Sequence, residues 1–337
     1  MEEDFELTLF DRLEVIKQTI NKYGEENFYL SFSGGKDSTV VHYLLDMALP
    51  NNNIPRVFIN TGIDYLDIIK FVNNLAKKDK RFVIIKPTKP IKKILEIDGY
   101  PIKSKQHSHN LSIYQNNIKK VEQYRNMIEN NKGLLNDYNF IHSLPNGVKT
   151  VIKYLYGVRE KNNELYFSNH TCPEILKYQF TPSFNLKSSD KCCYRMKKEP
   201  AHLYEINNNK SIKILGLREN EGGMRKVHTG CVAFDNNNNL KEFKPINPIS
   251  DEFEEWFINK YNIQLCKLYY PPFNFKRTGC RGCPYALELQ KQLEIMQSYL
   301  PNEAKSCEII WKPVYDEYRT NKYRLKEKEE YEQLRLF

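Results

Sequence analysis

The N-terminal quarter of the chain alternates short apolar runs with helical patterns, and this alternation restricts the fold more than any other feature. Residues 27–32, 55–60 and 82–86 predict buried strands, and residues 38–47 and 66–76 between them predict helices. Strands joined by helices at this spacing form a parallel sheet with right-handed crossovers. The sequence therefore predicts an α/β fold with a doubly wound, Rossmann-like parallel sheet, in which ligands bind at the carboxyl ends of the strands.

The start of the chain predicts an amphipathic helix. Its apolar residues recur at helical spacing, and we expect this stripe to face the core; they are Leu7, Phe10, Leu13, Ile16 and Ile20. The first residues are acidic rather than basic, and no apolar run approaches the roughly 20 residues of a membrane span. We therefore expect a cytoplasmic protein.

The first predicted strand ends in a glycine-rich turn, Ser31-Phe32-Ser33-Gly34-Gly35-Lys36-Asp37-Ser38. Two adjacent glycines let the backbone approach an anion, the amides of the following helix N-terminus point outward, and Lys36 adds a positive charge. Such a turn binds a phosphate or a pyrophosphate. The P-loop of kinase-like enzymes has two glycines separated by four residues and then Lys-Ser or Lys-Thr, so we expect different chemistry here.

The string Ser-Gly-Gly-Lys-Asp-Ser resembles the PP-loop of the adenine nucleotide alpha-hydrolase-like superfamily, whose ATP-using members cleave the bond between the α and β phosphates. The resemblance implies that the leaving pyrophosphate is held by Ser33, Gly34, Gly35 and Ser38. It also implies that Lys36 stabilises the charge that accumulates on this leaving group.

Asp37 has two alternative roles. Its carboxylate suits a magnesium ion, which would neutralise the developing charge of pyrophosphate. A negative charge in the first turn of a helix also stabilises the helix N-terminus by itself. Both alternatives remain open at the level of sequence.

Four of the eight cysteines are clustered in two pairs. Cys192 and Cys193 are adjacent, and Cys280 and Cys283 form a Cys-Arg-Gly-Cys knuckle. In a reducing compartment such pairs suit metal ligation better than disulfides. Four thiolates hold either zinc or a four-iron four-sulfur (4Fe-4S) cluster. Adjacent ligands reach two corners of a cluster more easily than two corners of a zinc site, so we favour the cluster and keep zinc and buried, unligated thiols as alternatives.

The segments around these cysteines resemble the phosphoadenosine phosphosulfate (PAPS) reductase family. Residues 277–285 are similar to its Arg-Thr-Gly-Cys-x-x-Cys-Pro-aromatic signature, and Asn60-Thr61-Gly62 to its Asp-Thr-Gly. Residues 216–221 are similar to its Gly-x-Arg-x-x-Glu segment, and residues 248–256 to its proline-to-tryptophan passage. The resemblance spans about residues 27–287 and implies a cluster on the four paired cysteines.

Three features differ from the sulfonucleotide reductases. Those that are assimilatory end in a short tail whose cysteine attacks the sulfonucleotide, whereas no cysteine follows Cys307 here. Their PP-loop tends to be degenerate because their substrate has no pyrophosphate to release, whereas this one is intact, which favours ATP over adenylyl sulfate. Finally, Asn60 replaces an aspartate, which argues against a charged contact at this position and still allows backbone contacts from Thr61 and Gly62.

These motifs define the predicted site. The catalytic residues are Lys36, Asp37 and Arg218. Bidentate guanidinium groups suit a phosphate or a sulfate, so Arg225 is added to the nucleotide-binding residues. The full nucleotide-binding set is Ser31, Phe32, Ser33, Gly34, Gly35, Lys36, Asp37, Ser38, Thr39, Asn60, Thr61, Gly62, Gly216, Arg218 and Arg225.

Four regions follow along the chain. The stretch from 104 to about 147 is rich in Asn, Lys, Gln and Tyr. After it, a fourth apolar strand at 211–217 returns the chain to the sheet. The end of the chain predicts a charged helix over 315–337. The regions are 1–103, the N-terminal part of the PP-loop nucleotide-binding domain; 104–150, a polar helical insertion; 151–290, the remainder of the reductase-like domain with its cysteine-cluster region; and 291–337, a charged helical tail.

The leading hypothesis is an enzyme that binds ATP and Mg²⁺, forms AMP and pyrophosphate, and uses a 4Fe-4S cluster in sulfur transfer. The net charge of +9 is compatible with a nucleic-acid acceptor and is also ordinary for a soluble protein. Expected partners include a sulfur-donor or thioredoxin-like protein, and an oligomer is compatible with the sequence. The alternatives are reduction of PAPS or adenylyl sulfate to sulfite, and a nucleotide-binding subunit or sensor that turns nothing over.

Overall fold

The computed structural model describes residues 2–219 and 230–326, so the predicted ligand Arg225 lies outside the described residues. The chain forms two compact units, and each is built from two separate stretches of sequence. The first unit comprises Met1–Pro90 and Arg195–Arg281, and the second comprises Ile91–Tyr194 and Gly282–Phe337. Within the described ranges, no helix is both long and apolar enough to cross a membrane.

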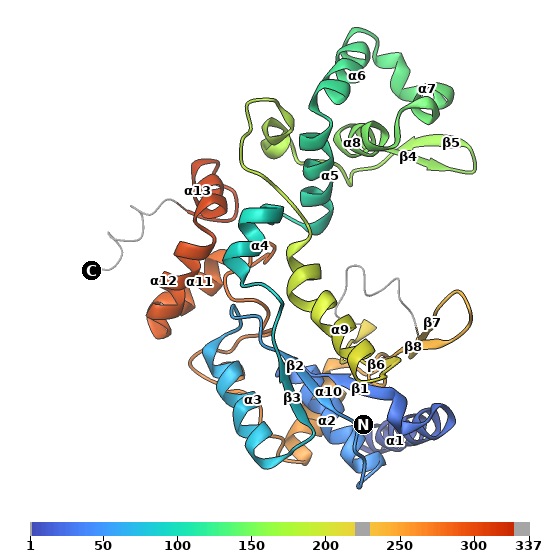
Figure 1. Ribbon diagram of the computed structural model, residues 1–337, viewed down its shortest axis with the longest axis vertical. Coiled ribbons are helices and arrows are strands. Elements are labelled where there is room, and N and C mark those ends of the chain that lie inside the picture. Colours follow the sequence, from blue (N-terminus) through green and yellow to red (C-terminus); the bar gives the residue numbers. More distant parts are fainter. Residues whose placement is uncertain (1, 220–229, 327–337) are drawn as a thin grey trace. The chain divides into compact units, whose positions relative to one another are not determined.

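The first unit contains a six-stranded sheet in the order β3-β2-β1-β6-β8-β7 (Figure 1). All neighbours are parallel except β7, which runs antiparallel to β8. The strands are β1 (Phe28–Ser31), β2 (Arg56–Ile59), β3 (Phe82–Ile85), β6 (Ile212–Ile214), β7 (Val232–Phe234) and β8 (Leu240–Phe243). The predicted α/β fold with a mostly parallel sheet is confirmed.

The strand order reverses beside β1. From β1 the chain moves outward through β2 to β3, and it later returns to place β6 on the other side of β1. The carboxyl ends of β1 and β6 therefore flank a topological switch point, which is where ligands bind in open α/β sheets. The turn that follows β1 and the segment that follows β6 are thus brought to one place.

Both faces of the central strand are covered. Phe28, Tyr29 and Leu30 are all buried, as expected in the middle of a parallel sheet with helices on both sides. One face is covered by α9 (Glu199–Asn207), because the Tyr204 ring lies 5.5 Å from the Tyr29 ring and Glu205 accepts the Tyr29 hydroxyl at 2.8 Å. Elsewhere in this unit, α2 (Lys36–Ala48) packs against α1 (Glu2–Tyr23) and against α10 (Asp251–Lys260). The remaining helix beside the sheet, α3 (Leu66–Lys78), packs against β3.

The opening helix exists as predicted, and Ile16 and Ile20 are buried as expected, but the first half of its buried face is different. Leu7 and Phe10 are 69% and 67% exposed, and Leu13 is half-buried. The buried stripe is formed by Leu9, Arg12, Ile16 and Ile20. The prediction counted only apolar residues and therefore missed Arg12, whose Nη1 bonds the Pro245 carbonyl and the Cys231 sulfur, each at 3.3 Å.

The second unit is helical, and the polar insertion forms helices as predicted. Its helices are α4 (Ile91–Asp98), α5 (Lys105–Asn116), α6 (Ile118–Asn130), α7 (Tyr138–Ser143), α8 (Asn146–Tyr156), α11 (Leu289–Tyr299), α12 (Pro301–Ile310) and α13 (Lys312–Thr320). The predicted helix over 315–337 differs from the structure, because α13 ends at Thr320 and residues 321–326 are not helical. Lys322 and Arg324 adopt positive φ there, which a helix cannot accommodate. Residues 327–337 lie outside the described part.

A short antiparallel hairpin follows α8 and was not predicted. It consists of β4 (Val158–Lys161) and β5 (Glu164–Phe167). The connecting residues Asn162 and Asn163 have φ of 53° and 63°, the left-handed pair that a tight hairpin turn requires and that asparagine tolerates. The Asn-Asn pair between two short runs was therefore a usable sequence signal.

The core of the second unit contains a polar link between α5, α8 and a 3₁₀ segment (Glu174–Phe180). His107 Nδ1 lies 2.9 Å from the Tyr154 hydroxyl, and His107 Nε2 lies 2.7 Å from Gln179 Oε1. Burial lowers the pKa of His107 to about 4. The imidazole is therefore neutral at physiological pH and bonds with both ring nitrogens.

Candidate functional site

The turn between β1 and α2 is closed by its own hydroxyls. Ser33 Oγ accepts the amide of Gly35 at 3.2 Å and lies 3.0 Å from Ser38 Oγ, which in turn donates to the Gly35 carbonyl at 3.0 Å. Gly34 has φ of +70°, and a β-carbon there would lie 2.9 Å from Ile68 Cγ2. Both its conformation and its surroundings therefore require glycine at this position.

The flanking predicted residues belong to the strand and to the helix that the turn joins. Ser31 is the last residue of β1. The buried Phe32 ring lies 5.0 Å from the Phe82 ring, and Thr39 Oγ1 donates to the Gly35 carbonyl at 2.9 Å. These contacts hold the N-terminus of α2 against the sheet.

A tyrosine that the sequence did not single out lies over the turn. The backbone amide of Lys36 donates to the Tyr269 hydroxyl at 3.1 Å, and this hydroxyl lies 2.8 Å from Thr278 Oγ1. Thr278 belongs to the Arg-Thr-Gly-Cys segment that leads into the cysteine knuckle. The Lys36 amide, at the start of α2, therefore donates its hydrogen bond to the Tyr269 hydroxyl. This hydroxyl occupies the position in which an oxygen of a bound anion would accept the same hydrogen bond.

The segment after β6 passes directly beside the turn. A β-carbon at Gly216 would lie 2.9 Å from the Asp37 carbonyl carbon and 2.9 Å from the Ser38 amide nitrogen. Glycine at this position permits the close approach, and it brings Arg218 to the N-terminus of α2. The predicted residues Gly216 and Arg218 are thus assembled with the predicted turn.

Arg218 is buried and bonds three carboxylates. Its Nε lies 2.7 Å from Asp37 Oδ1, its Nη1 lies 2.5 Å from Asp251 Oδ1, and its Nη2 lies 3.0 Å from Glu254 Oε2. Burial opposes its charge, but the hydrogen bonds and charges of these carboxylates outweigh burial and raise the pKa of Arg218. Its guanidinium holds the carboxylates in place, and Asp37 is engaged with Arg218.

Glu254 is the central residue that sequence reasoning missed. It lies on α10, is fully buried, and its Oε2 is 2.7 Å from Lys36 Nζ. Burial raises the pKa of Glu254 above its usual range, and the nearby charge of Asp37 raises it further, while Lys36 and Arg218 oppose this shift. In sequence Glu254 belongs to the acidic first turn of a helix, where carboxylates are common because they stabilise the N-terminus.

The end of β2 forms a small turn of its own. Asp64 Oδ2 accepts the amide of Thr61 at 2.8 Å and its hydroxyl at 2.7 Å, and Asn60 Oδ1 accepts the amide of Gly62 at 3.1 Å. Gly62 has φ of +78°, and a β-carbon there would meet no atom within 4 Å. Asn60 thus serves the turn, and the space beside Gly62 is open. Arg281 of the knuckle donates its amide to the Ile63 carbonyl at 2.9 Å, which ties the knuckle to this turn.

The four paired cysteines are distributed over both units. Cys280 belongs to the first unit, and Cys192, Cys193 and Cys283 belong to the second. In the second unit burial raises the pKa of Tyr285, and the nearby thiols of Cys193 and Cys283 raise it further, so these two thiols share one neighbourhood. Among the described residues no three His, Cys, Asp or Glu side chains come together as a metal site.

Two of the unpaired cysteines, Cys172 and Cys266, have thiols of low reactivity. Cys172, Cys266 and Cys307 are buried, and burial raises the pKa of the Cys172 thiol to about 12 and also raises that of Cys266. A thiol with a raised pKa carries little of the reactive thiolate form at neutral pH. The half-buried Cys231 accepts a hydrogen bond from Arg12.

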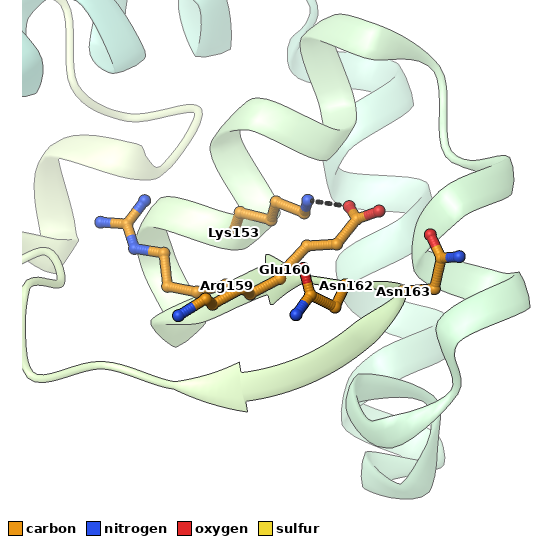
Figure 2. A pocket seen from close by; sticks show the side chains of 6 residues that line it. Lys153, Arg159, Glu160, Asn162 and Asn163 are labelled. Carbon is orange, nitrogen blue, oxygen red and sulfur yellow. Dashed lines mark hydrogen bonds and ion pairs between the residues drawn. The ribbon is translucent and has the colours of Figure 1, made fainter.

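A separate groove of about 470 Å³ lies beside the hairpin of the second unit (Figure 2). Three cations and one carboxylate line it together with the two turn asparagines: Lys153, Arg159, Glu160, Lys161, Asn162 and Asn163. Lys153 Nζ pairs with Glu160 Oε2 at 2.8 Å, so Arg159 and Lys161 give the groove its excess of positive charge. Tyr166, directly opposite Arg159 in the hairpin, is 49% exposed.

The chain matches the family model of the phosphoadenosine phosphosulfate reductase domain over residues 27–136 and 147–286. It is similar to an uncharacterized protein of Methanocaldococcus jannaschii, with 33% identity over 93 residues, which are 27% of this chain and 22% of that protein. This chain thus spans about a fifth of that relative's length.

Two solved structures are similar at low identity. The PAPS reductase of Candida auris matches with a TM-score of 0.39 and 10% identity, over 80% of this chain and 93% of that one. The FMN adenylyltransferase of Candida glabrata matches with a TM-score of 0.44 and 11% identity, over 82% of this chain and 62% of that one.

Proposed function

Since the chain belongs to the phosphoadenosine phosphosulfate reductase domain family, we propose that it is an enzyme that binds ATP at the turn between β1 and α2 and cleaves it between the α and β phosphates. The observation that carries this proposal is the assembly of Lys36, Asp37 and Arg218 at the N-terminus of α2, beside the switch point of the sheet. An intact lysine and aspartate at this place would be unnecessary in a scaffold.

The chain's own groups account for the cleavage of ATP. A nucleophilic oxygen of the acceptor forms a bond to the α phosphorus, the bond from that phosphorus to the bridging oxygen breaks, and pyrophosphate leaves. The amides at the start of α2, the hydroxyls of Ser33 and Ser38, and Lys36 would bind the leaving group, because preorganised donors stabilise charge as it develops. Mg²⁺ would share that charge, with Asp37 as its protein ligand once Arg218 releases this carboxylate.

The second step transfers sulfur to the activated acceptor. A sulfide donor displaces AMP from the adenylylated acceptor: the acceptor atom forms a bond to sulfur, its bond to oxygen breaks, and AMP leaves with that oxygen. Four thiolates are a suitable donor set for a 4Fe-4S cluster, and Cys192, Cys193, Cys280 and Cys283 would hold it. When bound, such a cluster would supply a site that holds sulfur. A single zinc ion on the same thiolates is the alternative.

A nucleic acid is the proposed acceptor. The net charge of +9 and the positive groove at the hairpin, with Arg159 and Lys161, support an anionic polymer as substrate. The exposed Tyr166 opposite Arg159 adds an aromatic surface on which a base can stack.

An anaerobic turnover assay tests the reaction. ATP labelled at the α phosphate is incubated with Mg²⁺, a sulfide donor and either tRNA or duplex DNA, and the products are separated. We expect AMP and pyrophosphate in equal amounts, with at least a hundredfold loss in Lys36→Met and no change in the exposed control Lys77→Met. The appearance of ADP and phosphate, or of no product with either acceptor, would contradict the proposal.

The metal content tests the cluster. Protein purified without oxygen is expected to be brown and to contain about four iron atoms per chain. Cys280→Ser should lose iron, whereas Cys231→Ser, which alters a thiol outside the two pairs, should keep it. A colourless protein with one zinc per chain would show that zinc, and not a cluster, is bound.

A further inference from the structure

Five charged side chains meet at the N-terminus of α2, and they differ in how far they are exposed to solvent. Two are the cations Lys36 and Arg218, and three are the carboxylates of Asp37, Asp251 and Glu254. The side chains of Asp37 and Asp251 are 22% and 66% exposed, whereas that of Glu254 has no exposed surface. A carboxylate that is removed from water in this way depends on its cationic partners.

The two cations differ in how much they depend on Glu254. Arg218 also bonds Asp37 at 2.7 Å and Asp251 at 2.5 Å, so it keeps two carboxylates if Glu254 is neutralised. Lys36 has its ion pair with Glu254, 2.7 Å away, and no other carboxylate within 4 Å among the described residues. Its side chain is 22% exposed, so the ammonium can reach the open side of the turn.

We propose that Glu254 competes with bound pyrophosphate for Lys36 and thereby sets how readily the turn releases its product. Lys36 rests on Glu254 in the nucleotide-free protein, moves to the phosphate chain when the turn is occupied, and returns to Glu254 as pyrophosphate leaves. No covalent bond changes in this exchange. The inference rests on the proposed function, because it assigns Lys36 to the phosphates of ATP.

The competition follows from the placement of the two anions. A phosphate chain bound at the N-terminus of α2 would attract the Lys36 ammonium, which in this structure lies 2.7 Å from the buried carboxylate of Glu254. The phosphate and the buried carboxylate repel each other, and the ion pair between Lys36 and Glu254 is lost or weakened when the phosphate takes Lys36. Glu254 is therefore a positioning residue that acts through Lys36.

Binding of inorganic pyrophosphate, measured by calorimetry on the full chain with Mg²⁺, tests the proposal. Glu254→Gln keeps the shape of the side chain and removes the competing charge, so it should bind pyrophosphate about tenfold more tightly than the wild type. In steady-state turnover of ATP both kcat and KM should fall, because product release slows. Equal or weaker binding of pyrophosphate by this variant overturns the proposal.

Two controls separate the competition from a general effect of charge. Glu255→Gln removes an exposed carboxylate of the same helix and should leave the affinity unchanged. Asp251→Asn removes a carboxylate that bonds Arg218 and not Lys36, and it should tighten binding less than threefold. An equal effect of Asp251→Asn and Glu254→Gln on pyrophosphate affinity overturns the proposal, since the total negative charge at the site would then explain both effects.

Two further measurements keep the test decisive. In a Lys36→Met background, adding Glu254→Gln should not tighten pyrophosphate binding, and tightening there would contradict a competition for Lys36. If Glu254→Gln does not fold, infrared difference spectra of wild-type protein with ¹³C-labelled glutamate should show a carboxylate band that changes on pyrophosphate binding, and a flat spectrum counts against the proposal. A wild type that binds neither pyrophosphate nor ATP overturns the proposed function as well, whereas binding without a Glu254 effect overturns this inference alone.

Discussion

At the carboxyl end of β6, the backbone of Gly216 lies against the first turn of α2, and a β-carbon there would stand 2.9 Å from two backbone atoms of Asp37 and Ser38. Those atoms belong to the turn that holds Lys36, so they cannot move without displacing the candidate site. This contact joins two motifs that are almost 180 residues apart in the sequence.

We therefore predict that Gly216→Ala disturbs the site more than the fold. Overpacking against backbone atoms costs about 1–3 kcal/mol of unfolding free energy, and the shift would move Arg218 away from Asp37. Urea unfolding and pyrophosphate affinity measure the two effects, and we expect the affinity to fall at least tenfold. Gly133→Ala, where no positive φ is required and a β-carbon would meet only the side-chain oxygen of Asn131, serves as the control. A variant with unchanged affinity would show that the close approach is not needed.

A second prediction concerns Arg218 itself. Lysine keeps the charge but lacks the planar fork that bonds three carboxylates at once, so Arg218→Lys should release Asp37 or Asp251. We expect at least a tenfold fall in the kcat of ATP cleavage with little change in the thermal midpoint. Arg319→Lys on α13, whose guanidinium bonds Glu308 with two nitrogens, makes the same chemical change outside both the turn and the groove and should leave the kcat unchanged.

The sequence predicted the residues of the turn because their signals are local. Two glycines, a lysine and an aspartate between a strand and a helix can be recognised without any knowledge of the rest of the chain. Glu254 and Tyr269 could not be recognised, because their roles depend on contacts with Lys36, which lies more than 200 residues earlier. In sequence a buried glutamate in the first turn of a helix looks the same as a solvated one.

At the scale of elements, α5 and α8 are linked by a histidine that must remain neutral. Burial lowers the pKa of His107 to about 4, whereas an unfolded histidine titrates near 6.5. The unfolded state therefore binds a proton that the folded state does not bind between these pH values. The stability that depends on neutral His107 is present above pH 6.5 and is lost as the pH falls toward 4.

We predict that this residue makes the second unit acid-sensitive, with a loss of about 3 kcal/mol between pH 6.5 and 4. Trp311 is buried in this unit, so its fluorescence in a Trp256→Phe background reports unfolding there. His107→Gln should flatten the dependence on pH. An equally steep profile in the variant would assign the acid sensitivity to other groups.

The hairpin carries a prediction about the acceptor. Arg159→Glu with Lys161→Glu reverses the excess charge of the groove and should weaken binding of a fluorescent tRNA or DNA at least tenfold at low salt. Binding of pyrophosphate should not change, because none of these side chains belongs to the turn. Lys119→Glu with Lys120→Glu, on α6, matches the change in charge at another place on the insertion. Equal losses in both pairs would point to the total charge rather than to the groove.

The elements also show where sequence reasoning fails. The strands were predicted because buried parallel strands are continuous apolar runs, and Phe28, Tyr29 and Leu30 fit that rule. The buried face of α1 was assigned correctly at Ile16 and Ile20 and wrongly at its first turns, since a periodicity that counts apolar residues cannot see that Arg12 lies on the inner side. A pattern shows that a helix is amphipathic, but its neighbours decide which face is buried.

For the whole molecule, the family predicted from the cysteine knuckle and the glycine turn is confirmed, because the family match covers residues 27–136 and 147–286. Each unit has a core of its own, with Phe28 and Leu44 in the first and Trp311 and Phe180 in the second. Units with separate cores need not unfold together.

We predict that urea unfolds the chain in more than one step. In the Trp256→Phe background, the fluorescence of Trp311 follows the second unit only, whereas far-UV circular dichroism follows all helices and strands. The two curves should have different midpoints. Coincident curves would show that the two units unfold as one cooperative body.

The order of the strands in the sheet has a consequence for synthesis on the ribosome. The centre of the sheet pairs β1 with β6, yet β6 begins at Ile212, more than 180 residues after β1 ends at Ser31. At about 5–20 residues per second, the emerging chain spends roughly ten seconds or more with one edge of β1 unpaired. Until then the unpaired backbone groups along this edge are open to pairing with another chain. The nascent protein is therefore most exposed to aggregation, and most dependent on chaperones, while the insertion is being translated.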